Sequence, residues 1–248
     1  MIYTRRNDKI IQMIIDSARI KKATGFSVRV IDSCASTFDE LGNYDAVIAK
    51  TQTGGIGRGD HTFFSPYGGV YIVMRLNGLD IAPLTLTPTV GLAVRDAIKV
   101  ITGRDTTLKW VNDVLLDSKK LCGILCKCPR RGEYIIGVGV NYSTDIKEFE
   151  KAGLSEIATT LDAPEMSATD FCIELINRIK HYAKLPFDCK RYNALCATVG
   201  KDVEFTYNGE TLQGAAERVE KDGSLIVKMG SATVAVDAGE VSIVRNIN

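Results

Sequence analysis

Hydrophobic positions in the first part of the chain follow two periods, one typical of strands and one typical of helices. Short apolar or alternating stretches predict strands over residues 27–33, 45–53, 68–76, 108–116, 120–128 and 133–141. Apolar residues at helical spacing predict helices over 5–22, over 88–102 and through a segment with Phe171, Leu175, Ile179 and Tyr182 on one face. Helices and strands are therefore both expected before residue 196.

Candidate capping residues mark where these helices begin. Ser36 is a candidate N-cap for a short acidic helix, and Ser167 or Thr169 caps the helix that carries Phe171. Thr87 and Pro88 form an N-cap and first-position pair. These residues predict helix starts at 37, at 88 and near 168.

The last three strands of this part are expected to pair as antiparallel hairpins. Their links, Asp-Ser-Lys at 117–119 and Pro-Arg-Arg-Gly at 129–132, contain turn-forming residues. Residues 143–157 are then expected to form an exposed loop.

The composition changes from about Cys196. Asn-Gly, Asp-Gly and Gly-Ser turn signals separate short alternating stretches in the tail. This pattern predicts a small barrel of roughly fifty residues. We therefore expect two domains, 1–195 and 196–248.

A glycine-rich loop precedes the strand at 68–76. Arg58 lies within it, among Gly54, Gly55, Gly57 and Gly59. Glycine lets backbone approach a ligand closely, and arginine matches phosphate or carboxylate geometry, so the loop is a candidate anion cradle. It matches neither the dinucleotide fingerprint nor the P-loop. A mobile surface loop is the alternative.

Bulk composition excludes several classes of protein. The net charge of +1 over 248 residues argues against binding nucleic acid through a general positive field. No apolar run approaches the length of a membrane span, and the seven cysteines, an odd number, favour a reducing compartment. We expect a cytoplasmic protein. Cys122, Cys126 and Cys128 lack zinc-knuckle spacing and are expected to be buried small hydrophobic residues.

Short motifs in a fixed order resemble those of the biotin protein ligases. They are Ser-Thr at 36–37, QTGGIGRG at 52–59, SPYGGVY at 65–71, KWVND at 109–113, KKLCGIL at 119–125, GVGVN at 137–141 and AGEVS at 238–242. The resemblance implies an α+β fold, in which a mixed sheet with flanking helices, related to class II aminoacyl-tRNA synthetases, precedes an SH3-like barrel. It also implies the short type of ligase that lacks an N-terminal DNA-binding domain.

The resemblance implies an ATP-dependent reaction in two steps. Biotin and ATP, with Mg²⁺, give biotinyl-5′-AMP and pyrophosphate, and biotin then passes to a lysine of a biotin carboxyl carrier domain, as in acetyl-CoA carboxylase. DNA and membranes are not expected partners, and the oligomeric state stays open, with a homodimer as one alternative. A lipoate or octanoate ligase and a catalytically silent biotin or nucleotide sensor are the rival functions.

The resemblance also assigns site residues. Lys120 and Arg58 are implied to act on the reacting groups, although Lys119 is equally basic and only the spacing to Gly123 favours Lys120. Biotin binding is implied for Ser36, Thr37, Gln52, Gly55, Gly69, Lys120 and Gly123. Nucleotide binding is implied for Arg58, Lys109, Trp110, Asn112, Asp113 and Asn141, with Asp113 also toward Mg²⁺. Trp110 covers adenine or fills the core. The chain departs from the family at Phe38, where asparagine is usual, and at Asp60, a negative charge in the glycine loop.

Overall fold

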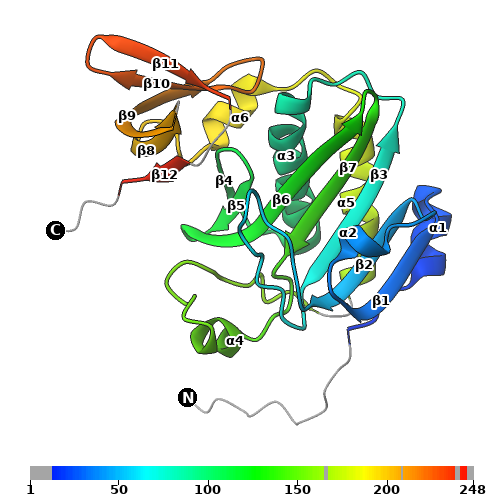
Figure 1. Cartoon of the computed structure of the whole chain (residues 1–248). Coiled ribbons are helices and arrows are strands. Elements are labelled where there is room, and N and C mark those ends of the chain that lie inside the picture. The colour runs from blue at the N-terminus through cyan, green and yellow to red at the C-terminus, as the bar shows by residue number, and fades with distance from the viewer. Residues whose placement is uncertain (1–12, 165–166, 208, 238–240, 245–248) are drawn as a thin grey trace.

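The computed structural model describes residues 13–164, 167–207, 209–237 and 241–244 (Figure 1). Its helices are α1 (Ser17–Thr24), α2 (Thr37–Glu40), α3 (Pro83–Thr102), α4 (Ile146–Lys151), α5 (Ala168–Tyr182) and α6 (Cys189–Leu195). Its strands are β1 (Val28–Cys34), β2 (Ala46–Gln52), β3 (Val70–Asn77), β4 (Thr107–Lys109), β5 (Asp113–Leu116), β6 (Lys119–Arg130), β7 (Glu133–Val140), β8 (Asp202–Tyr207), β9 (Glu210–Val219), β10 (Leu225–Met229), β11 (Ala232–Val236) and β12 (Val241–Ile243).

A seven-stranded mixed sheet forms the larger part of the fold. Its strand order is β1-β2-β3-β7-β6-β5-β4. β1 and β2 run parallel, whereas the remaining neighbours run antiparallel. Helices α3 and α5 pack together along one face of the sheet (Figure 1). The expected mixed sheet with flanking helices and the two expected hairpins, β5–β6 and β6–β7, are confirmed.

Helix α3 fills the centre of the core with a continuous apolar stripe. Its buried residues include Val90, Ala93, Val94, Ala97 and Ile98. The predicted helix start at residue 88 is wrong, because α3 begins at residue 83, where a proline takes the first helical position and its missing N–H costs nothing. The second proline, at 88, lies inside the helix about one turn later and removes a single backbone bond.

Three other expectations about local structure need correction. Residues 108–116 do not form one strand, because a turn at 110–112 separates β4 from β5. Residues 143–157 contain helix α4, which begins after Asp145, whose carboxylate caps the helix. Residues 13–16 are not helical, since α1 begins after its N-cap Asp16, and residues 5–12 of the predicted helix lie outside the described residues.

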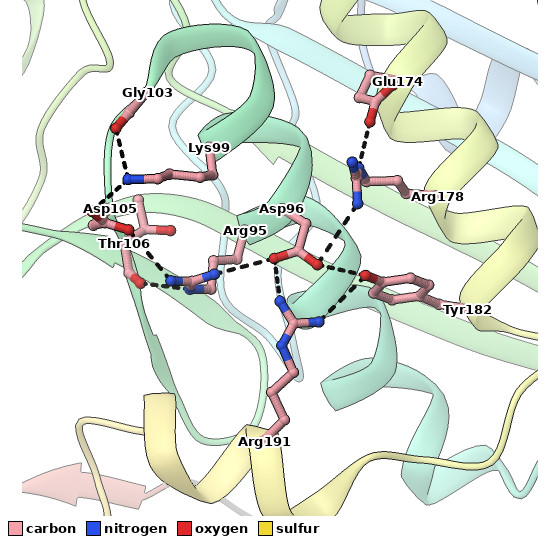
Figure 2. A network of polar contacts seen from close by, with 10 residues as sticks. All are labelled: Arg95, Asp96, Lys99, Gly103, Asp105, Thr106, Glu174, Arg178, Tyr182 and Arg191. Atoms are coloured by element: carbon pink, nitrogen blue, oxygen red, sulfur yellow. Dashed lines mark hydrogen bonds and ion pairs between the residues drawn. The ribbon is translucent and has the colours of Figure 1, made fainter.

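A charge cluster behind the sheet joins α3, α5 and α6 (Figure 2). Asp96 on α3 accepts hydrogen bonds from Tyr182 on α5 and from Arg191 on α6. Arg95 and Arg178 also form ion pairs with this carboxylate, whose side chain is only 10% exposed. The cluster therefore fixes α6, which leads into the C-terminal strands, to the central helix.

The C-terminal strands form a five-stranded antiparallel sheet in the order β11-β10-β9-β8-β12. Alternation buries one face, which includes Val203, Phe205 and Val227. The small all-β unit is thus confirmed. Among the described residues β11 and β12 do not pair, so closure into a barrel stays a prediction.

Three hydrogen bonds join β4 and the turn after it to the C-terminal part. The Ala197 N–H donates to the Leu108 carbonyl at 2.7 Å. Trp110 donates its backbone N–H to Thr198 Oγ1 and its indole N–H to the Gly223 carbonyl, each at 3.0 Å. The hydrophobic core also runs through both parts. A domain boundary at residue 196 therefore stays a prediction.

Strand β6 carries the clustered cysteines from the core to the surface. Cys122 is buried, but Cys126 is half-buried and Cys128 is exposed. The expectation of burial is therefore right only for Cys122, because the hairpin end at 127–130 extends into solvent. No helix within the described part of the chain combines the length and the apolar character that crossing a membrane requires.

Candidate active site

Glycines on two neighbouring strands leave a bare patch on the sheet. Gly123 on β6 pairs with Gly139 on β7, and Gly137 lies two residues before Gly139 and so on the same face. The side chain of Ile124 lies toward α3, so Gly123 faces away from that helix. The patch therefore allows a flat group to lie directly against the sheet backbone.

Two phenylalanine rings lie over this patch. A Cβ atom built on Gly123 or Gly139 would lie 2.7 or 2.6 Å from the ring of Phe63. A Cβ on Gly137 would lie 2.5 Å from the ring of Phe38. The rings thus take the space that side chains would fill, which explains why these strand positions are glycine.

A cavity of about 250 Å³ lies over the patch. Its walls come from the glycine loop, the β5–β6 hairpin, the turn at 110–112 and strand β12. The predicted site residues that line it are Thr37, Gln52, Arg58, Lys109, Trp110, Asn112, Asp113, Lys120 and Gly123. Arg58 and Lys120, which lie far apart in the sequence, therefore share one cavity.

Lys120 and Asp113 form an ion pair inside this cavity. The lysine Nζ lies 2.8 Å from Oδ1 of Asp113 and 5.4 Å from the centroid of the Phe63 ring. Lys119 instead donates a 2.6 Å hydrogen bond to the Ser155 carbonyl and does not line the cavity. The structure thus distinguishes two lysines that the sequence leaves nearly equivalent.

Thr37 and Gln52 meet at one end of the cavity. Because β1 and β2 run parallel, with Cys34 opposite Gln52, the start of α2 lies next to the end of β2. The Thr37 backbone N–H and hydroxyl donate to Gln52 Oε1 at 2.8 and 3.1 Å. These polar groups are held in place before any ligand arrives.

Ser36, Gly55, Gly69 and Asn141, the other predicted site residues, do not line the cavity. Ser36 is buried, and its hydroxyl accepts the backbone N–H of residue 38, so it caps α2 as expected. Asn141 is also buried and donates to the Thr159 carbonyl at 2.9 Å, while its Oδ1 accepts no hydrogen bond.

Trp110 is a core residue that also lines one edge of the cavity. It is 3% exposed, and its indole N–H is used by the Gly223 carbonyl. The tryptophan therefore connects the cavity wall to the C-terminal sheet. Contact with adenine stays a prediction.

Sequence reasoning did not assign Phe63, Gly137, Gly139, Val241 or Ser242 to the site, although all of them line the cavity. The sequence does contain a signal for a sheet face without side chains. Glycines alternate on one predicted strand, at 137 and 139, and the neighbouring strand carries Gly123. The last two residues belong to the AGEVS motif, of which 238–240 lie outside the described residues. The motif reaches the site because β12, the edge strand of the C-terminal sheet, lies at the wall of the cavity.

Asp113 is the candidate ligand for Mg²⁺. Its carboxylate lines the cavity with Oδ1 paired to the Lys120 ammonium at 2.8 Å, and carboxylate oxygens are hard donors of the kind that Mg²⁺ prefers. In the described part of the chain no three His, Cys, Asp or Glu side chains come together as a metal site. A single carboxylate would suit a Mg²⁺ ion, which proteins commonly hold through one or two carboxylates together with substrate phosphates.

Comparison with known proteins finds a matching family and several relatives. Residues 27–141 match the Biotin/lipoate A/B protein ligase family. The chain is 24% identical to the bifunctional ligase/repressor BirA of Escherichia coli, over 94% of this chain and 79% of that protein. It is 30% identical to the biotin--[acetyl-CoA-carboxylase] ligase of Mycobacterium tuberculosis, over 64% of this chain and 62% of that one.

A solved structure shows the same fold. The biotin protein ligase from Aquifex aeolicus in complex with biotin and ATP has a TM-score of 0.75 to this chain, at 23% identity, over 88% of this chain and 99% of that one. The family match over residues 27–141, the relatives and the shared fold thus agree that this chain is similar to the biotin/lipoate A/B protein ligases.

Proposed function

We propose that this chain is an ATP-dependent biotin protein ligase whose reaction takes place in the cavity over the bare glycine patch. The observation that carries the proposal is that Arg58, Lys120 and Asp113 line one cavity floored by Gly123 and Gly139. An apolar floor beside a few fixed polar groups suits the fused rings of biotin. The charged residues suit the phosphates of ATP.

In the first step an oxygen of the biotin carboxylate bonds to the α-phosphorus of ATP, and the bond from that phosphorus to pyrophosphate breaks. Both reactants are anions, so the site must offset their repulsion and hold them aligned. We assign this work to the ammonium of Lys120 and the guanidinium of Arg58. Mg²⁺, when bound near Asp113, adds positive charge at the phosphates.

In the second step the neutral amine of an acceptor lysine attacks the acyl carbon of biotinyl-AMP, AMP leaves with the bonding electrons, and the amine nitrogen releases one proton to solvent as the amide forms. We assign the acceptor to a biotin carboxyl carrier domain. A cytoplasmic location is supported by the seven cysteines, all of which are free thiols. For the oligomeric state, a homodimer stays one alternative.

The proposed function is tested by following the acceptor and the ligand separately. We expect a purified carrier domain to gain the mass of one biotinyl group when the enzyme, biotin, ATP and Mg²⁺ are all present. In thermal-shift titrations biotin should raise the melting temperature, and more so with ATP, because ligands that bind the folded state stabilise it. A larger shift with lipoate or octanoate, and transfer of that acyl group, would indicate the rival ligase.

Replacing Phe63 with alanine should speed biotin binding. The Phe63 ring lies on the glycine patch and contacts Tyr71 edge-on, so biotin must displace it to reach the floor. Losing contacts of this kind, worth roughly 1 kcal/mol, should raise the association rate constant about three- to tenfold. Stopped-flow binding or surface plasmon resonance measures this rate constant.

The neighbouring aromatic residue provides the control. Phe64 packs against Phe149 and does not line the cavity, so Phe64→Ala should leave the association rate within about twofold of wild type. An unchanged or slower association rate in Phe63→Ala would show that the ring does not obstruct biotin.

A further inference from the structure

We propose that Ser65 is a positioning residue for biotin, because it fixes the amide of Gln52 from outside the cavity. This inference rests on the proposed function. Ser65 is 3% exposed and does not line the cavity, whereas Gln52 does. Any effect of Ser65 on biotin must therefore pass through the groups that it contacts.

The Ser65 hydroxyl makes two hydrogen bonds with opposite roles. It accepts one from Gln52 Nε2 at 3.0 Å and donates one to the Phe63 carbonyl at 2.8 Å. Because its single hydrogen is used by that carbonyl, the hydroxyl can only accept from the glutamine. It therefore requires the nitrogen of the amide, and not the oxygen, to face residue 65.

Thr37 specifies the opposite end of the same amide. Its backbone N–H and hydroxyl both donate to Gln52 Oε1. One Nε2 hydrogen binds Ser65. Neither Ser65 nor Thr37 uses the other Nε2 hydrogen, which can therefore be donated to a ligand. Ser65 and Thr37 together hold Gln52 in one of its two flip states.

Backbone pairing keeps Ser65 in register with Gln52. The Gln52 N–H and the Thr51 hydroxyl both donate to the Ser65 carbonyl at 2.9 Å. Gly55 leaves room for the arrangement, since a Cβ there would lie 2.5 Å from Ser65 Oγ and 2.3 Å from the Phe63 carbonyl oxygen. Gly55 of the glycine loop is thus needed to make room for the Ser65 hydroxyl that binds the Gln52 amide.

The test is steady-state kinetics of pyrophosphate release by the full chain. Ser65→Ala should raise KM for biotin about tenfold, as expected for a ligand-binding amide that loses its fixed orientation. The kcat and the KM for ATP should stay within about twofold of wild type. A general loss of structure would change both of them as well, so these two constants distinguish it from a positioning effect. Ser65→Thr, which keeps the hydroxyl, should restore most of the biotin affinity.

Two further variants make the test specific. Thr51→Val removes one of the two hydrogen bonds to the Ser65 carbonyl, but the Gln52 N–H still holds the register and the Gln52 amide is untouched, so KM for biotin should not change. In a Gln52→Ala background, Ser65→Ala should have no further effect on KM, because the group it positions is absent. Ser65→Cys, with a weakly hydrogen-bonding thiol of similar shape, replaces the alanine variant if that variant does not fold.

The outcomes separate this inference from the proposed function. If wild type releases no pyrophosphate with biotin and ATP, the proposed function is wrong. If wild type is active but Ser65→Ala leaves KM for biotin unchanged, or its effect adds fully to that of Gln52→Ala, then Ser65 does not act through Gln52.

Discussion

Lys120→Ala is expected to slow the formation of biotinyl-adenylate by about 10²-fold or more. The reaction brings a carboxylate to a polyphosphate, and a preorganised cation at the point of reaction typically contributes an effect of this size. The Lys120 ammonium lines the cavity 2.8 Å from Asp113. Its removal also leaves that carboxylate without its partner, next to the incoming phosphates. Single-turnover release of pyrophosphate measures the effect on the chemical step.

Lys119→Ala is the matched control. This lysine is adjacent in sequence and carries the same charge, but it donates to the Ser155 carbonyl and lies outside the cavity lining. We expect its loss to change the rate by less than about threefold. Equal losses in the two variants, or a loss below about threefold in Lys120→Ala, would show that the wrong lysine has been assigned.

Asp96→Asn is expected to lower the free energy of unfolding by about 3 kcal/mol at pH 7. Breaking a buried ion pair by removing one partner typically costs about this much. In this chain the loss leaves Arg95, Arg178 and Arg191 facing one another without the carboxylate between them (Figure 2). Urea unfolding, followed by circular dichroism, measures the change.

The stability that Asp96 provides should depend on pH. Burial acts to raise the pKa of Asp96, but hydrogen bonds from Arg191 and Tyr182 and the nearby arginine charges outweigh it, so the pKa is lowered. The stabilisation should thus be complete above about pH 4, the ordinary pKa of aspartate, and lost as the pH falls through the lower folded-state pKa. The difference between wild type and Asp96→Asn should shrink over that range.

Asp105 offers a control for the same arginine-rich region. Its side chain is 70% exposed, and it pairs with Lys99 and Arg95 at the surface. Such pairs contribute little because water and salt screen them. Asp105→Asn should therefore leave the unfolding curve almost unchanged, and a loss as large as that of Asp96→Asn would contradict the role given to burial.

Local patterns in the sequence predicted the strands and turns whose formation depends on neighbouring residues alone. Strand periodicity located β6 and β7, and the turn residues between them predicted the hairpin, because both signals are short-range. The glycine loop stood out because its chemistry is visible in the residue types, whereas Lys120 was assigned through the family resemblance, since Lys119 beside it is equally basic. These features placed Arg58 and Lys120 on two segments that the structure brings to one cavity.

Long-range contacts account for what the sequence did not reveal. The turn at 110–112 interrupts an apolar stretch that looks like one strand, and its Trp110 is held by Thr198 and Gly223 from the C-terminal part. Proline is favoured at the first helical position, so Thr87 and Pro88 predicted a start at 88, whereas α3 begins at the earlier proline, residue 83. Phe63 became part of the site only when pairing of β6 with β7 placed two glycines beneath its ring.

Pyrophosphate release shows whether this cavity activates biotin with ATP. Wild type, ATP and Mg²⁺ should release pyrophosphate when biotin is added, and much less when lipoate or octanoate replaces it. Lys120→Ala should lose this release while Lys119→Ala retains it. Release that is absent with biotin, or that is greater with lipoate or octanoate, would contradict the account.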